Sequence, residues 1–268
     1  MTLLDGSCGS KLWALADECG IENVPTWIYN IEHPELVTKM HKQYIEAGSD
    51  MIQTNTFAVN SMSVKRYPQY TVEQIVTAAV KLAKEAVKGT DVKVYLSSGP
   101  LAMLLEPYGD LEEDDCRQEY ETIVGAAKDA GAEAIMLETF MDLEMMKIAS
   151  SEALKTGLPV SCSMTFEARM HTIMGNSVES ICSALSDTGI SAIGMNCSKG
   201  PVDGLEVIKE YKKHTDLPLY FKPNAGMGEK YSAEQFAREM QPSLEFVSYI
   251  GGCCGTDENY IKELKKLL

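Results

Sequence analysis

The segment Tyr249-Ile250-Gly251-Gly252-Cys253-Cys254-Gly255-Thr256 places two adjacent cysteines in a glycine-rich turn. This turn comes at the end of the short apolar run 246–250, which is typical of a buried strand. Glycines on both sides free the backbone to turn sharply, so both sulfurs can point at one spot. A second cysteine turn, at 194–198, also follows an apolar run and contains Cys197. The three thiols would suit a metal site if the fold brings the two turns together.

Short apolar runs alternate with longer segments of helical period along the whole chain. The runs are 3–5, 51–54, 92–98, 134–138, 159–164, 192–195, 219–221 and 246–250, and the helical segments are 34–47, 71–88, 112–130, 142–156, 177–188, 203–215, 233–241 and 257–267. Eight strand–helix units predict an α/β fold in which residues 1–268 form one (β/α)8 TIM barrel. The alternative is an open doubly wound sheet, but no Gly-x-Gly-x-x-Gly follows the first run.

The composition narrows the class of protein. The 268 residues include 39 acidic and 24 basic side chains, for a formal charge of -15, which disfavours binding to nucleic acid or to anionic membranes. The N-terminus shows no signal-peptide pattern, and no apolar run is long enough to span a bilayer. Eight cysteines without secretory features indicate a reducing compartment, so we expect a cytoplasmic protein.

The polar residues at the strand ends define the candidate site, because active sites of such barrels lie at the C-terminal ends of the strands. Asp5 and Gly6 follow the first run, Glu138 ends the fourth, and Lys222-Pro223-Asn224 follows the seventh. Only one strand separates the sixth run from the eighth, so Cys197 can meet the cysteine pair. Three thiolates favour zinc, and three protein ligands leave a fourth position open for a substrate.

The ligand set also predicts the reaction. Three thiolates leave Zn2+ with a net charge of -1, so the metal activates water poorly, but it can hold an incoming thiol as a thiolate. A free thiol has a pKa of about 8.5 and is mostly protonated at neutral pH. We therefore expect a zinc-held substrate thiolate to attack an electrophilic carbon. Asp5 and Glu138 could bind a substrate ammonium, and N–H groups of the glycine turns could bind its carboxylate.

The chain resembles the zinc-dependent homocysteine S-methyltransferases, a family of (β/α)8 barrels. The resemblance rests on Asp-Gly at 5–6, Asn-Thr-Phe at 55–57, Gly-Pro at 99–100, Glu-Thr-Phe-x-Asp at 138–142, Ser-Met-Thr-Phe at 163–166, Gly-x-Asn-Cys-Ser-x-Gly-Pro at 194–201, Lys-Pro-Asn-Ala-Gly at 222–226 and Gly-Gly-Cys-Cys-Gly-Thr at 251–256. It implies that Cys197, Cys253 and Cys254 bind zinc, and that homocysteine is the methyl acceptor. It assigns the substrate amino group to Asp5 and Glu138, and its carboxylate to Gly6 and Ser7. We add Ser163 and Asn196 as candidate substrate contacts because they are adjacent to the turn that contains Cys197.

The resemblance leaves several methyl donors open. Ala58 stands where the betaine-using branch has a tyrosine, which disfavours betaine. The chain looks like the homocysteine module of cobalamin-dependent methionine synthase, so methylcobalamin on a separate corrinoid protein is one expected donor. A sulfonium compound, S-methylmethionine or S-adenosylmethionine, is the alternative. Two other interpretations are a zinc site that only braces the barrel, with Cys8 as fourth ligand, and a subunit that presents homocysteine to a partner enzyme.

The remaining sulfur and imidazole side chains are expected to be structural. We interpret Cys8 as a packing residue at the rim of the site. Cys19, Cys116, Cys162 and Cys182 are interpreted as core fillers, and His33, His41 and His214 as surface residues of helices.

Overall fold

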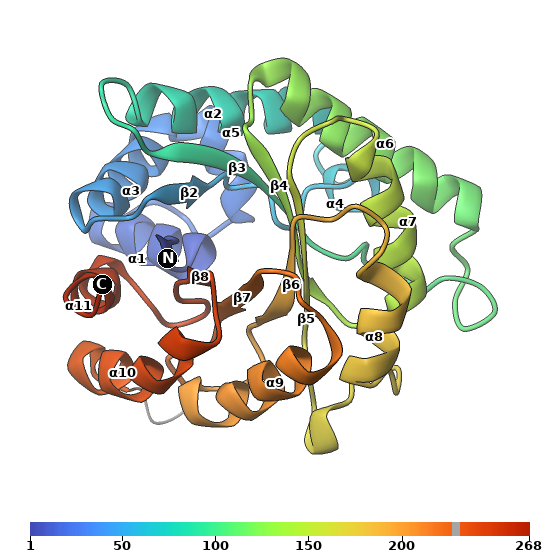
Figure 1. Ribbon diagram of the computed structural model, residues 1–268. Coiled ribbons are helices and arrows are strands. Elements are labelled where there is room, and N and C mark those ends of the chain that lie inside the picture. Colours follow the sequence, from blue (N-terminus) through green and yellow to red (C-terminus); the bar gives the residue numbers. More distant parts are fainter. Residues whose placement is uncertain (227–230) are drawn as a thin grey trace.

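The computed structural model describes residues 1–226 and 231–268. Eight parallel strands form a nearly closed barrel, in the order β1-β8-β7-β6-β5-β4-β3-β2 (Figure 1). The strands are β1 Thr2–Leu3, β2 Met51–Gln53, β3 Lys93–Ser98, β4 Ala134–Phe140, β5 Val160–Met164, β6 Ala192–Asn196, β7 Leu219–Lys222 and β8 Tyr249–Ile250. The predicted (β/α)8 barrel is confirmed, and all eight expected strands are present.

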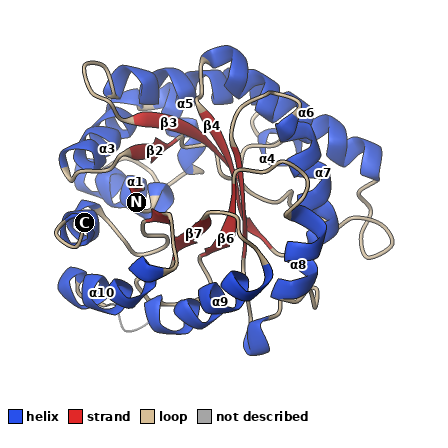
Figure 2. Cartoon of the chain, viewed as in Figure 1, coloured by secondary structure: helices blue, strands red, loops and turns tan. Residues whose placement is uncertain are grey.

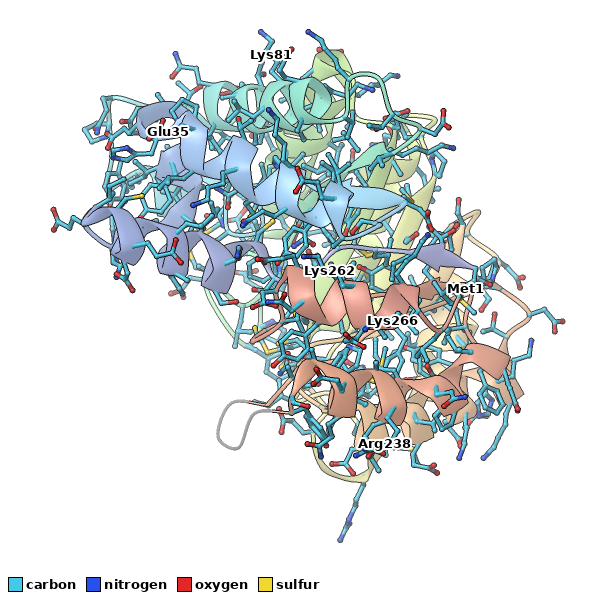
Figure 3. All side chains as sticks on the ribbon, turned by 90° about the vertical axis from the view of Figure 1, so that its left-hand side faces the viewer. Met1, Glu35, Lys81, Arg238, Lys262 and Lys266 are labelled. Atoms are coloured by element: carbon cyan, nitrogen blue, oxygen red, sulfur yellow. The ribbon has the colours of Figure 1, made fainter. Side chains whose placement is uncertain are left out.

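Helices surround the strands on the outside of the barrel (Figure 2). The eight expected helices are α3 Pro34–Glu46, α5 Val72–Ala86, α6 Glu113–Ala130, α7 Leu143–Leu154, α8 Val178–Leu185, α9 Pro201–His214, α10 Ala233–Met240 and α11 Glu258–Lys265. Side-chain caps begin several of them, as at Thr71, whose hydroxyl accepts the N–H of Gln74. Charged side chains such as Lys81, Arg238 and Lys266 point outward from these helices (Figure 3).

The first two strand–helix units contain more helix than the sequence pattern predicted. Helix α1, Cys8–Cys19, follows β1 directly, and the short helices α2 Tyr29–Glu32 and α4 Ser61–Val64 were also missed. Ser7 caps α1 by accepting the N–H of Ser10, and Gly20 ends the helix at a positive φ of 68°. Its buried stripe consists mainly of Leu12, Leu15 and Ala16, and so short a stripe gives only a weak helical period in the sequence.

Acidic side chains help to join the two strands at the seam of the barrel. β1 and β2 end the strand order on opposite sides, but Asp50 N–H donates to Leu3 O at 2.7 Å. In return, the Asp50 carboxylate accepts the Leu3 N–H at 2.8 Å. One step further along, the Asp5 carboxylate accepts the Gln53 N–H at 2.7 Å. Asp5 therefore has a structural role in the seam as well as a place in the candidate site.

The apolar core lies in two layers. The larger layer fills the space between strands and helices, and a smaller cluster inside the barrel contains Leu4, Tyr95, Met136 and Tyr220. Among the described residues, no helix has the length and apolar character that crossing a membrane requires. Tyr95, Met136 and Tyr220 of this smaller cluster lie in the first half of their strands, so the cluster fills the N-terminal end of the barrel interior. The polar groups of the candidate site lie at the opposite, C-terminal end of the strands.

Two structural interpretations of single residues were wrong. Cys19 is exposed, because it ends α1 on the side away from the core, whereas Cys116, Cys162 and Cys182 are buried as expected. His41 is fully buried rather than at the surface. It lies on the face of α3 that also buries Val37, Met40 and Tyr44, a spacing that puts all four on one side of a helix.

Candidate active site

The three predicted cysteine ligands converge at the C-terminal end of the barrel. Their sulfurs all lie within 4.8 Å of one another, and the Sγ atoms of Cys197 and Cys254 are 3.8 Å apart. The end of β7 and the residue after it hold both cysteine turns, since Lys222 O accepts the Cys197 N–H at 3.0 Å and Pro223 O accepts the Cys253 N–H at 2.9 Å. The intervening strand is therefore the template that brings the two turns together.

Backbone conformation directs these sulfurs inward. Cys197 has a positive φ of 57°, which costs free energy for a residue with a side chain. Gly255 has a φ of 83°, where glycine is favoured. At Gly252 a Cβ would lie 2.5 Å from the Thr256 side chain, so the tight turn requires glycine. The Thr256 hydroxyl closes this turn by donating to Cys253 O at 2.7 Å.

The cluster fits a thiolate metal site. Tetrahedral zinc with Zn–S bonds of about 2.3 Å places neighbouring sulfurs about 3.8 Å apart, which matches the Cys197–Cys254 distance. Hydrogen bonds from Cys253 and then Cys254 lower the pKa of Cys197, so one thiolate is stabilised even without a metal. All three cysteines are partly exposed, which leaves the cluster open to a substrate. Zinc is the metal that such a soft donor set favours.

Cys8 does not belong to this cluster. Among the described residues, the group of potential metal ligands comprises the three cysteines alone. The Cys8 thiol is buried at the start of α1 and lies 3.8 Å from Gln53 O. Burial raises its pKa, with a further contribution from the Asp5 charge, so the thiol is protonated. The geometry agrees with a packing role for Cys8.

Asn196 connects the cysteine cluster to the end of β4. Its Oδ1 accepts the Thr139 N–H at 2.8 Å and the Ser163 hydroxyl at 2.7 Å. Its Nδ2 donates to Thr139 Oγ1 at 2.7 Å and lies 3.7 Å from Cys253 Sγ. Asn196 and Ser163 are both completely buried, and the Asn196 amide is occupied by the protein itself. Asn196, held by Ser163, therefore contacts the Cys253 thiol from the buried side of the cluster and orients it.

This connection also shapes the backbone of β4. The pairing of β4 with β5 shifts register between Leu137 and Phe140, and Thr139 within this irregularity has a positive φ of 67°. The Asn196 side chain satisfies both the N–H and the hydroxyl of Thr139, so it supports the strained residue. Glu138, immediately before it, is buried beside the cluster, and burial raises its pKa, with further contributions from the charges of Asp5 and Cys197.

The two predicted carboxylates have different surroundings. Asp5 accepts three hydrogen bonds from the protein, from Gln53 N–H, Tyr95 Oη and Lys222 Nζ. Glu138 accepts one, from the Ser97 hydroxyl, among the described residues. Burial is the main reason why the pKa of Glu138 is raised, and the positive charge of Lys222 opposes this shift. The sequence analysis placed Lys222 at the rim without a specific role, and it did not single out Tyr95 or Ser97.

The N-terminus of α1 lies beside the cysteine turn. The Ser7 N–H donates to Thr256 Oγ1 at 3.2 Å, which ties the start of α1 to the turn at 251–256. Within the described part of the chain, the N–H groups of Cys8 and Gly9 have no acceptor. No atom would lie within 4 Å of a Cβ at Gly9, so the space in front of this helix end is open. A helix N-terminus with free N–H groups favours an anion.

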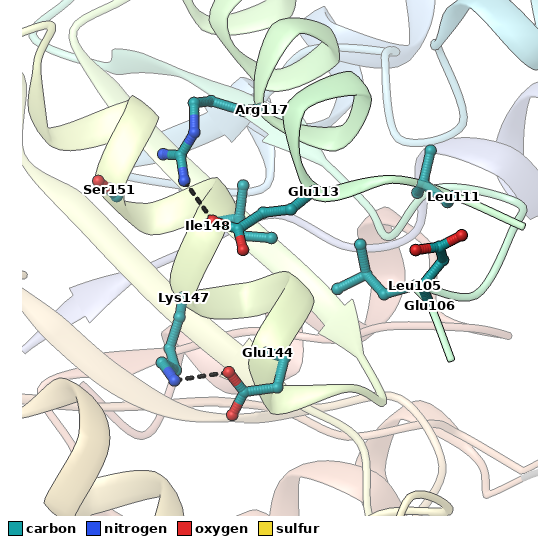
Figure 4. A pocket seen from close by; sticks show the side chains of 9 residues that line it. All are labelled: Leu105, Glu106, Leu111, Glu113, Arg117, Glu144, Lys147, Ile148 and Ser151. Atoms are coloured by element: carbon teal, nitrogen blue, oxygen red, sulfur yellow. Dashed lines mark hydrogen bonds and ion pairs between the residues drawn. The ribbon is translucent and has the colours of Figure 1, made fainter. Parts of the chain in front are cut away.

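A cavity of about 520 Å³ lies away from the thiols, between the β3–α6 loop and the helices α6 and α7 (Figure 4). Its two basic side chains are already paired, Arg117 with Glu113 and Lys147 with Glu144. None of the predicted site residues lines it. The chemistry of the chain is therefore concentrated at the thiol cluster and not in this cavity.

The fold and the site together define a (β/α)8 barrel with a three-thiol centre at the C-terminal ends of β6 and β8. The sequence pattern of the homocysteine S-methyltransferase family matches residues 2–268, and the chain belongs to this family.

The chain is 30% identical to methionine synthase of Mycobacterium tuberculosis and 29% identical to that of Mycobacterium leprae. Each match covers 97% of this chain, but the chain spans about a quarter of the length of these relatives, 24% in both cases. The fold also matches the metallated form of the homocysteine methyltransferase MmuM from Escherichia coli, with a TM-score of 0.83 at 22% identity. That match covers 99% of this chain and 96% of the MmuM chain.

Proposed function

We propose that this protein transfers a methyl group to the thiol of homocysteine and so forms methionine. The observation that carries this proposal is the convergence of Cys197, Cys253 and Cys254 beside the buried carboxylate of Glu138, in a chain that belongs to the homocysteine S-methyltransferase family. A thiol amino acid needs both features, a centre for its sulfur and a counter-charge for its ammonium group.

Zinc is the proposed metal, and the three cysteines are its ligands. When bound, zinc would lower the pKa of a coordinated substrate thiol and leave one position for that thiol. The chain's own residues prepare the centre: Lys222 and Pro223 at the end of β7 fix the two cysteine turns, and Asn196 lies beside Cys253 Sγ. A buried amide next to a ligand sulfur orients it and moderates its charge.

The substrate's charged groups would bind on either side of the thiols. The buried carboxylates at this end of the barrel, Asp5 and Glu138, are the candidates for binding the ammonium group, and Asp5 is already paired with Lys222. The turn at Gly6 and Ser7, with the free N–H groups that begin α1, would bind the carboxylate. Ser163 and Asn196 would support the site without contacting the substrate, because Asn196 holds Thr139 and Cys253 in place.

Methylcobalamin on a separate corrinoid protein is the proposed donor. The curated relatives extend over about four times the length of this chain, so the donor-carrying part would belong to another polypeptide or segment. Exposed large apolar side chains also occur in the loops and helix starts that follow β2 to β6, where a partner would approach; they include Phe57, Tyr108, Met141, Ile173 and Val202. Together at one end of the barrel, such side chains would suit contact with a partner.

A free sulfonium donor is the second candidate. The barrel without further domains accounts for 96% of the MmuM chain, so a protein of this extent is compatible with a self-sufficient enzyme. The third candidate function is that of a subunit that binds homocysteine and presents it to a partner enzyme.

The test is methionine formation from L-homocysteine by the zinc-loaded protein, with methylcobalamin, S-methylmethionine and S-adenosylmethionine in parallel. Turnover with methylcobalamin alone supports the corrinoid route, and turnover with a sulfonium replaces it by the second candidate. If homocysteine binds but no donor supports turnover, addition of a corrinoid protein decides between an enzyme and a binding subunit. Failure to bind homocysteine would refute the proposed function.

A further inference from the structure

Lys222 is a fully buried cation at the bottom of the candidate site. It ends β7 and is 1% exposed. Its Nζ donates to Asp5 Oδ1 at 3.0 Å, to Gln53 Oε1 at 2.9 Å and to the Tyr95 hydroxyl at 3.1 Å. An ammonium group has three protons, so every donor of Lys222 is satisfied by the protein. Burial alone would lower its pKa, but the adjacent Asp5 charge reverses this, so the pKa is raised and Lys222 stays charged.

Asp5 is in turn fully engaged by protein donors. Its Oδ2 accepts the Gln53 N–H at 2.7 Å, and its Oδ1 accepts the Tyr95 hydroxyl at 2.8 Å as well as the Lys222 ammonium. Asp5 is 0% exposed. A buried carboxylate with a buried ammonium at hydrogen-bond distance is electrically neutral as a pair. A second ammonium group at Asp5 would have to displace Lys222 from a closed network that joins four strands.

Glu138 has the opposite surroundings. It is 4% exposed and accepts a hydrogen bond from the Ser97 hydroxyl, its one donor among the described residues. A carboxylate can accept about four hydrogen bonds, so most of its capacity is unused. Because Lys222 pairs with Asp5, Glu138 is the buried carboxylate at this end of the barrel that has no ion-pair partner among the described residues. A buried carboxylate with one neutral donor favours a cationic partner.

We infer that Lys222 is a specificity-determining positioning residue: it occupies the cation position at Asp5 and thereby leaves Glu138 as the single carboxylate that receives the substrate's ammonium group. This inference rests on the proposed function and divides the roles of the two carboxylates. Asp5 closes the β1–β2 seam and holds Lys222, and Glu138 recognises the amino group. The site then accepts a thiol that carries one ammonium group.

The experiment compares two thiols that differ only in the amino group, L-homocysteine and 4-sulfanylbutanoate. Their dissociation constants are measured by calorimetry on the zinc-loaded protein, with the zinc content determined for each variant. The wild type is expected to prefer homocysteine by about 10- to 100-fold, the range for a hydrogen bond to a charged group. Glu138→Gln is expected to bring this preference close to unity, because the counter-charge is lost.

The matched control replaces Asp5→Asn and Lys222→Met together, which removes the ion pair without leaving either charge alone. We expect this double variant to keep the preference for homocysteine within about threefold of wild type. If the double variant does not fold, Asp5→Asn together with Lys222→Gln serves the same purpose, because both charges are removed and the Asn amide oxygen can still accept the Gln53 N–H.

The outcomes separate this inference from the proposed function. If a double variant that removes both charges loses the preference as completely as Glu138→Gln does, Asp5 also binds the ammonium group and the inference is overturned. If the wild type binds both thiols equally but still methylates homocysteine, the inference fails and the proposed function stands. If the wild type binds neither thiol, both are overturned.

Discussion

Acid should destabilise this protein through one buried histidine, His41 on α3. Its side chain is 0% exposed, and neither ring nitrogen has a hydrogen-bond partner among the described residues. Burial lowers the pKa of His41 to about 4, from an ordinary value of 6.5. Between these two pH values the unfolded chain binds a proton that the folded chain does not bind, so stability falls as the pH falls.

The size of this effect follows from the two pKa values. At pH 7 both states are largely neutral at His41 and its titration contributes little. At pH 4.5 the difference corresponds to a loss of about 2.5 kcal/mol, and the loss approaches about 3 kcal/mol below pH 4, where both states are protonated. This is a substantial part of the stability of an ordinary domain.

His41→Leu removes the titrating group and keeps an apolar side chain in the buried position. Urea unfolding followed by circular dichroism at pH 7 and pH 4.5 gives the acid-induced loss of unfolding free energy for each protein. We expect this loss to be about 2.5 kcal/mol smaller in His41→Leu than in the wild type. His171→Leu, at an exposed histidine, is the control and should behave as the wild type does. Equal acid-induced losses in His41→Leu and the wild type would refute the reasoning.

Two further predictions concern the thiol centre. Cys197→Ala should abolish both zinc binding and methionine formation. The control Cys19→Ala, which removes an exposed thiol on α1, should leave both unchanged. If Cys197→Ala retains one equivalent of zinc, the proposed ligand set is wrong. Asn196→Ala should weaken zinc binding by about 10- to 100-fold, measured by competition with a chromophoric chelator, because the amide beside Cys253 Sγ and its support of Thr139 are lost. An unchanged zinc affinity in a folded Asn196→Ala protein would exclude this orienting role.

Local sequence patterns were sufficient for the barrel and for the position of its thiol cluster. Each strand appears as a short apolar run and each of the eight main helices as a periodic segment, because burial on both faces or on one stripe imposes these patterns. The cysteine turns could be placed at one end of the barrel because parallel strands all end at the same rim. Helix α1 was missed because its buried stripe is narrow, although the cap at Ser7 and the glycine at its end were visible signals.

Contacts between distant residues were decided by the tertiary structure alone. His41 was assigned to the surface from its polarity, but the packing of α3 buries it with Val37 and Tyr44. Lys222 and Asp5 are separated by 217 positions, and their pairing depends on the closure of the barrel around them. Sequence position could bring Asp5 and Glu138 to the same rim, but it could not distinguish them. The strand ends in the sequence therefore indicated which carboxylates lie at the site. The hydrogen-bond donors around each carboxylate come from several strands, so the folded barrel was needed to show which carboxylate is still free to bind a substrate.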